Sequence, residues 1–156
     1  MPRKTKKEIV VPIFKDSYLA AIKNSVNTHL YRNFYAKVNN KREDVAKNGE
    51  LSCAYFASSI LVMFGLISKI HLTVGGVEDD MKKNQWKKIK KPQIGGVLIW
   101  EAKKYDEGGI HRHLGFFIGK DKAVSNSSEK GFPIIHHYTY GRKRKIDSIY
   151  WNKKLD

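Results

Sequence analysis

The sequence contains a single cysteine, Cys53, and no long hydrophobic run. A lone cysteine forms no internal disulfide and no multi-cysteine zinc site, so it is either a small buried hydrophobe or a reactive thiol. No apolar stretch reaches the roughly 18 residues that a membrane-spanning helix needs. The basic residues 3–7 are followed by residues 8–12, which are too short and too interrupted for the hydrophobic part of a signal peptide. We therefore expect no membrane span and synthesis in the cytoplasm.

Acidic residues are also scarce. The chain has 30 Lys and Arg against 15 Asp and Glu, a formal net charge of +15. The positive charge is concentrated in residues 3–7, 82–91 and 142–145. These runs are either a solvated surface or a means of attracting a polyanion such as nucleic acid, a wall polymer or a membrane surface. A hydrophobic content of 41% predicts a packed globule despite this charge.

The chain shows no internal repeat, low-complexity tract or linker, which predicts a basic tail over residues 1–8 and one domain over 9–156. Apolar residues spaced by four predict a first helix from about Tyr18 to Leu30. Ser52 is a candidate N-cap for a second helix from Cys53 to Phe64. That helix has almost no polar face, so we expect it to be buried nearly all round. A further short helix is expected over residues 78–86.

From Gly95 onward the pattern changes from helices to strands separated by glycine-rich or charged turns. Expected strands cover residues 97–100, 113–118, 123–125, 134–140 and 146–151. Helices followed by strands predict an α+β fold, in which an antiparallel sheet packs against the buried Cys53 helix.

Cys53 and His113 are the candidates for catalysis. The N-terminus of a helix favours negative charge, so we expect it to lower the pKa of the Cys53 thiol and to supply N–H groups for an oxyanion. His113 begins a predicted strand, and Gly115 follows it on the same face, which leaves room for a partner side chain and a substrate.

A polar side chain on the neighbouring strand is expected to orient His113. If Lys120 and Asp121 alone form the turn, Gly115 pairs with Asn126, which then lies diagonal to His113 on the same face. A three-residue turn brings Ser125 there instead, and a histidine such as His136 is a further alternative. We therefore predict Asn126 as the third catalytic residue.

Three segments carry a resemblance to a known family. Residues 52–58 (SCAYFAS) resemble the nucleophile helix of the NlpC-like cell-wall peptidases, a branch of the papain-like cysteine hydrolases. Residues 95–100 (GGVLIW) resemble their first core strand, and residues 113–119 (HLGFFIG) resemble their histidine strand. The resemblance runs from about residue 49 to 126, roughly half of the chain.

The resemblance implies a papain-like fold and hydrolysis of an amide through an acyl-enzyme, with a peptide or peptidoglycan stem-peptide fragment as substrate. Cys53 and His113 carry over directly, and Asn126 lies near the family's polar third residue. A tyrosine that shapes the family's site corresponds to Tyr31 or Tyr35, and we predict Tyr35 and Ser125 as substrate or oxyanion contacts. Ser52, Ala54 and Gly96 depart from the residues usual in the family.

Other functions remain open at this point. The pairs His111/His113 and His136/His137 are conceivable zinc ligands, but no nearby carboxylate or second cysteine completes a site, so we expect no metal and no cofactor. A basic nucleic-acid-binding module, in which Cys53 and His113 are incidental, is the main alternative. A thiol hydrolase, transferase or deamidase that acts on a non-wall substrate and an inactive scaffold are the others.

Overall fold

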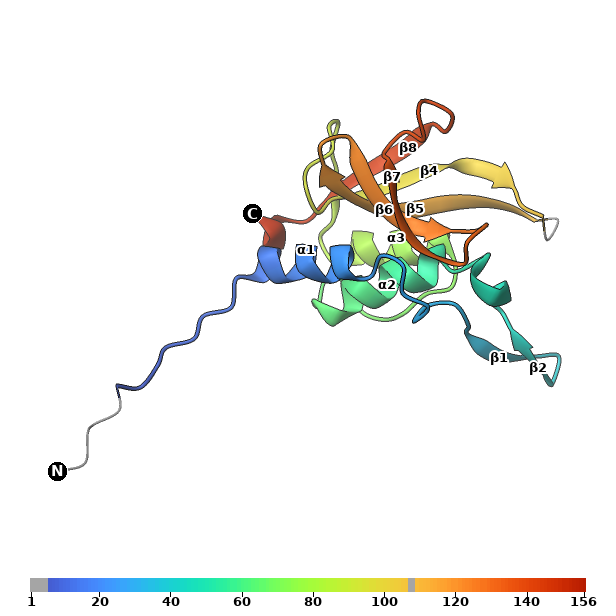
Figure 1. Ribbon diagram of the computed structural model, residues 1–156, viewed down its shortest axis with the longest axis horizontal. Helices are drawn as coiled ribbons and strands as arrows, with labels where there is room; N and C mark the ends of the chain where they lie inside the picture. Colours follow the sequence, from blue (N-terminus) through green and yellow to red (C-terminus); the bar gives the residue numbers. More distant parts are fainter. Residues whose placement is uncertain (1–5, 107–108) are drawn as a thin grey trace.

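The computed structural model describes residues 6–106 and 109–156. Its helices lie against one face of an antiparallel sheet, so the predicted α+β class is confirmed (Figure 1). The helices are α1 (Phe14–Asn24), α2 (Cys53–Met63) and α3 (Val74–Lys83), with short 3-10 turns at Lys47–Gly49 and Lys153–Leu155.

The main sheet has six strands in the order β3-β8-β4-β5-β6-β7, and every neighbouring pair is antiparallel. Their bounds are β3 Lys87–Lys88, β4 Val97–Lys104, β5 Ile110–Gly119, β6 Lys122–Ser127, β7 Phe132–His137 and β8 Ile146–Trp151. All five strands expected after Gly95 are present, and β8 has the predicted bounds.

Helix α2 is the centre of the core. It begins at Cys53 as predicted and ends one residue before Phe64, and it packs on β5 and β6. Phe56, Ile60 and Leu61 are almost completely buried, as the all-apolar pattern requires. Ser52 occupies the predicted N-cap position, but its hydroxyl makes no capping hydrogen bond within the described part of the chain.

The two faces of the sheet bury different sets of residues, as the alternation of side chains along a strand dictates. On the helix side, Leu114 and Phe116 of β5 pack with the side chains of α2. On the opposite side, Leu98, Trp100 and Ala123 form a second, smaller cluster. His113 pairs directly with Trp100 in the β4–β5 ladder, so His113 lies on the face away from α2.

The expected elements before the sheet differ from the structure in three places. Helix α1 ends at Asn24, and Leu30 is exposed rather than part of its apolar stripe. Helix α3 begins at Val74, because Thr73 caps it by accepting from the Gly76 N–H. Residues 35–44 form a separate hairpin that the sequence reading missed, with strands β1 (Tyr35–Val38) and β2 (Lys41–Asp44).

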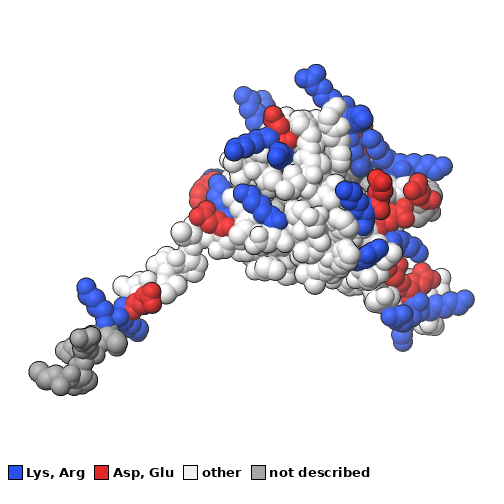
Figure 2. Space-filling model, viewed as in Figure 1, with Lys and Arg blue, Asp and Glu red and all other residues white. Residues whose placement is uncertain are grey.

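Residues 6–13 precede α1 without regular structure, and Figures 1 and 2 show this segment projecting from the folded body. Its apolar residues Ile9, Val10, Val11 and Ile13 are exposed. Among the described residues, no helix combines the length and the apolar character that crossing a membrane would require.

Candidate active site

Cys53 opens onto a pocket of about 510 Å³ at the N-terminus of α2. The side chain is partly exposed, as access to a substrate requires. Most of the lining is apolar, and it comes from the loop before α2, the start of α3 and strands β4 and β5. The lining residues are Val45, Glu50, Leu51, Cys53, Ala54, Leu72, Thr73, Val74, Gly75, Ala102, Tyr105, Ile110, His111 and Arg112.

The thiol of Cys53 is held in its neutral form. Burial raises its pKa to about 11, and this effect outweighs the backbone N–H groups of Leu114 and Ala54 and the charge of Arg144, which lower it. The helix N-terminus therefore lowers the pKa of Cys53 as expected, but burial has the larger effect. At neutral pH the resting site contains a thiol rather than a thiolate.

Cys53 meets β5 where β5 and β6 separate. The hydrogen-bonded ladder between these strands ends at the pair Phe116–Val124. Beyond this pair, the backbone N–H of Leu114 contacts the Cys53 sulfur and favours its thiolate form. The sulfur therefore lies against the backbone of the residue that follows His113. Within the described residues, no hydrogen bond joins the thiol to the imidazole.

His113 is buried on the Trp100 face, with 4% of its surface exposed and its ring 5.4 Å from the Trp100 ring. Burial lowers its pKa well below the ordinary value of 6.5, and the positive charge of Arg144 lowers it further. The imidazole is therefore neutral at neutral pH, which is the form that accepts a proton.

Ser125 is the centre of a hydrogen-bond network around His113. Its Oγ lies 2.9 Å from His113 Nε2, 2.7 Å from His136 Nε2 and 3.0 Å from the Tyr140 hydroxyl. A side chain at residue 115 would collide with Ser125, because a Cβ built on Gly115 lies 2.6 Å from the Ser125 Cβ. The space that Gly115 leaves is thus filled by Ser125.

The network assigns the proton positions. His136 Nδ1 lies 2.8 Å from the carbonyl oxygen of His137, and a carbonyl only accepts, so Nδ1 carries the proton. Neutral His136 then accepts the single Ser125 O–H at Nε2, and Ser125 accepts from His113 Nε2–H and from Tyr140. His113 Nδ1 is left with its lone pair, buried and without a hydrogen-bond partner among the described residues.

The expected contact between Asn126 and His113 is wrong. Asn126 instead donates its side-chain amide to the Gly49 carbonyl oxygen at 2.7 Å. The predicted pair Gly119–Lys122 does form, but Phe117 pairs with Ala123, which leaves Ile118 as an extra residue in β5. This bulge shifts the register by one residue and brings Ser125 to the position predicted for Asn126.

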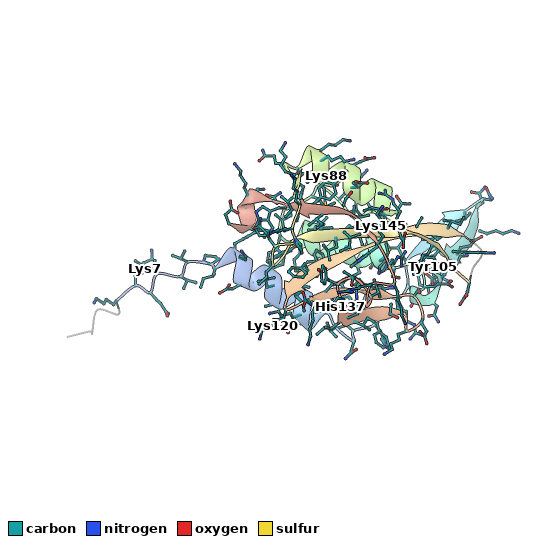
Figure 3. The ribbon with its side chains drawn as sticks, turned by 90° about the horizontal axis from the view of Figure 1, so that it is seen from above. Lys7, Lys88, Tyr105, Lys120, His137 and Lys145 are labelled. Atoms are coloured by element: carbon teal, nitrogen blue, oxygen red, sulfur yellow. The ribbon has the colours of Figure 1, made fainter. Side chains whose placement is uncertain are left out.

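The upstream tyrosines are not part of the pocket. Tyr35 is on the β1–β2 hairpin under the Arg42 guanidinium, and Tyr31 packs against Tyr55 and Phe56 in the core. Burial raises the pKa values of Tyr105 and Tyr140, and a Cys53 thiolate would raise them further, so these are the tyrosines close to Cys53. Figure 3 shows Tyr105 far from the N-terminal segment that carries Lys7.

Arg144 is the charged residue of the site that sequence reasoning missed. Its guanidinium donates to the Glu101 carbonyl oxygen at 2.9 Å and approaches that of His111. No carboxylate within the described part of the chain pairs with it. Burial raises the pKa values of Cys53 and Tyr140 and lowers that of His113, and the positive charge of Arg144 opposes the first two shifts and adds to the third. Arg144 therefore lies within electrostatic range of all three side chains.

Two of the remaining histidines have structural contacts. His71 bonds Asp80 at 2.7 Å, and His137 accepts from Thr139. Within residues 6–106 and 109–156, no group of three or more metal-ligating side chains is present.

No protein-family model matches the chain, and no curated protein matches it significantly.

The raised pKa predicts slow alkylation of Cys53 in the resting protein. At pH 7, a pKa of about 11 leaves only about one thiolate in 10⁴ molecules, against a few per cent for a free cysteine. The rate with iodoacetamide, followed by mass spectrometry, should keep rising to about pH 11. Arg144→Gln should move this rise to still higher pH, because it removes a charge that favours the thiolate. The urea-unfolded protein is the control, and a native rate that levels off below pH 8 would contradict the prediction.

Proposed function

We propose that the protein is a cysteine hydrolase that cleaves an amide through an acyl-enzyme, with Cys53 as nucleophile and His113 as base. One observation carries the proposal. Ser125 fixes the buried imidazole of His113 through Nε2, which leaves Nδ1 without a partner among the described residues. The backbone of the next residue, Leu114, contacts the Cys53 sulfur. A nucleophile, a base and an orienting group form the arrangement that acyl transfer requires.

Acylation starts from a neutral pair. Because the pKa of Cys53 is raised and that of His113 is lowered, the proton moves from sulfur to Nδ1 as the sulfur attacks the substrate carbonyl carbon. The imidazolium then gives this proton to the leaving amine as the C–N bond breaks. The product of this step is an acyl thioester on Cys53 and a free amine.

The N-terminus of α2 supports the oxyanion that forms during the attack. The first N–H groups of a helix have no intrahelical partner, and the Ser52 hydroxyl does not cap them here. These N–H groups are therefore available to donate hydrogen bonds to the oxyanion of a substrate bound at Cys53.

Deacylation uses the same base in reverse. His113 Nδ1 takes a proton from water as the water oxygen attacks the thioester carbonyl carbon. Collapse of the intermediate breaks the C–S bond, and the imidazolium returns the proton to the sulfur. An acid is released, and the neutral thiol and imidazole are restored.

The pocket next to Cys53 favours an acyl group with an apolar side chain. Leu72, Val74 and Ile110 contribute apolar surface, and the Arg112 charge is compensated by Glu78 at 2.9 Å. The peptidoglycan stem peptides implied by the family resemblance belong to the amide class of this proposal. We therefore take peptides with a small apolar residue at the cleaved bond as the first substrates to test.

The test is to trap the acyl-enzyme. The protein is incubated with p-nitrophenyl butyrate, quenched with acid and measured by intact-mass spectrometry. We expect one butyryl group on the wild type, located at Cys53 by peptide mapping, and none at this position in Cys53→Ala.

Ser59→Ala is the matched control, because Ser59 lies on the same helix and bonds only the Tyr55 carbonyl oxygen. It should be acylated like the wild type. Cys53→Ala should melt close to the wild type, with a cost near or below about 1 kcal/mol, because Cys53 faces a pocket. A wild type without a butyryl group on Cys53, together with a Cys53→Ala variant that melts much lower, would identify Cys53 as a core residue.

A further inference from the structure

Two basic runs that lie about fifty residues apart in the sequence come together around β8. Residues 90 and 91 follow β3, residues 142–145 precede β8, and β3 pairs with β8. Together they line one groove of about 620 Å³. Figure 2 shows several blue side chains at the upper end of the molecule, where Figure 1 places the loop before β8. The basic side chains of the groove are Lys90, Lys91, Arg142, Lys143, Arg144 and Lys145.

The positive charge of this groove is only weakly compensated by the described residues. None of the six basic side chains forms an ion pair with another described residue. Glu101 is the one carboxylate of the lining, and its Oε1 accepts from the backbone N–H of Lys145. A groove with six cations and one carboxylate attracts an anion that carries several charges.

The shape of the groove and its remaining lining narrow the choice of ligand. The cations line an open, shallow groove. Unlike a duplex, whose bases stack on each other, a single strand offers its bases to the groove. Tyr138, Ile146 and Ile149 also line it, and an aromatic side chain in a basic groove offers a stacking surface for a base.

We propose that this groove binds single-stranded nucleic acid, with the lysines and arginines on its phosphates and Tyr138 against a base. The groove lies beside the candidate active site, because Arg144 also lines a cavity of about 320 Å³ that shares Glu50 and Tyr105 with the Cys53 pocket. The binding itself does not depend on catalysis and is measured on the Cys53→Ala variant as well as on the wild type.

The experiment measures the binding of fluorescein-labelled oligothymidylate by anisotropy over a range of salt concentrations. The groove variant carries Lys90, Lys91, Lys143 and Lys145 changed to Gln. The control variant carries four exposed lysines outside the groove, Lys23, Lys37, Lys41 and Lys130, changed to Gln. Each variant lowers the formal net charge by four, from +15 to +11, so only the position of the removed charge differs. Circular dichroism and melting verify that both variants fold.

We expect the groove variant to bind at least about tenfold more weakly at low salt and to lose about 3 units of the salt slope, at about 0.7 for each phosphate contact of a single strand. The control variant should stay close to the wild type. An equal loss in both variants would overturn the proposal, because bulk charge would then explain the binding. Equal affinity for inorganic polyphosphate, tighter binding to duplex DNA, or binding only to phosphatidylglycerol vesicles would also overturn it.

Discussion

His113→Gln is expected to reduce the rate of acylation of Cys53 by about 10²- to 10⁴-fold. The glutamine amide is close in size to the imidazole and keeps a donor for Ser125, but it has no basic lone pair. The attacking thiol, with a pKa of about 11, is then left without a proton acceptor. This loss corresponds to about 3 to 5 kcal/mol of transition-state stabilisation. Single-turnover measurement of butyryl transfer in wild type and variant gives the ratio directly.

The pH profile distinguishes a base from a merely structural histidine. Neutral imidazole accepts a proton, so the acylation rate should fall as the pH drops through the His113 pKa, which lies well below 6.5. This acid limb should be absent in His113→Gln. Ser125→Ala removes only the orienting hydroxyl and should cost less than loss of the base, with the acid limb retained. A His113→Gln variant within a factor of three of the wild type would remove His113 from the mechanism.

Gly49→Ala is expected to be among the most destabilising single substitutions in the chain. Gly49 has φ +92°, and a Cβ there would lie 2.4 Å from the carbonyl oxygen of Gly131 and 2.5 Å from its Cα. Both neighbouring atoms are backbone, so a side-chain rotation does not relieve the collision. Backbone strain and overpacking together predict a loss of about 3 to 5 kcal/mol, or about 10 °C in melting temperature.

Gly65→Ala is the matched control. Gly65 also has a positive φ, +61°, but apart from its two chain neighbours no described residue has an atom within 4 Å of the position of its Cβ. The Gly65→Ala variant therefore tests backbone strain without a collision, and it should lower the free energy of unfolding by about 1 to 2 kcal/mol. Thermal melting of the three proteins measures the difference, and equal melting temperatures for the two variants would show that the contact with Gly131 relaxes freely.

The sequence predicted best those elements whose hydrophobic pattern is compatible with only one type of secondary structure. The apolar helix after Ser52 and strand β8 lie where expected, since a helix without a polar face must be buried and a strand bounded by turns has little freedom. The β1–β2 hairpin was missed although Asn39 and Asn40 carry its signal. Both have positive φ, a conformation that asparagine tolerates at a hairpin turn.

The candidate site was predicted only in part, because its details depend on tertiary structure. The bulge at Ile118 is one extra residue in a strand, and no residue pattern reveals it before the pairing is known. The bulge brings Ser125, instead of Asn126, next to His113. The raised pKa of Cys53 likewise follows from burial by surrounding elements, while the sequence shows only the helix N-terminus. Arg144 is distant in sequence from both Cys53 and His113.

The order of the strands also determines how the sheet ends. One edge is β3, which has only two residues, both exposed lysines. The other edge is β7, where Pro133 has no N–H to offer and its carbonyl oxygen accepts from Asn27. A short charged strand and a proline are features that discourage the pairing of sheets between molecules. The architecture that brings Cys53 to β5 therefore also protects a concentrated solution of the protein against edge-to-edge aggregation.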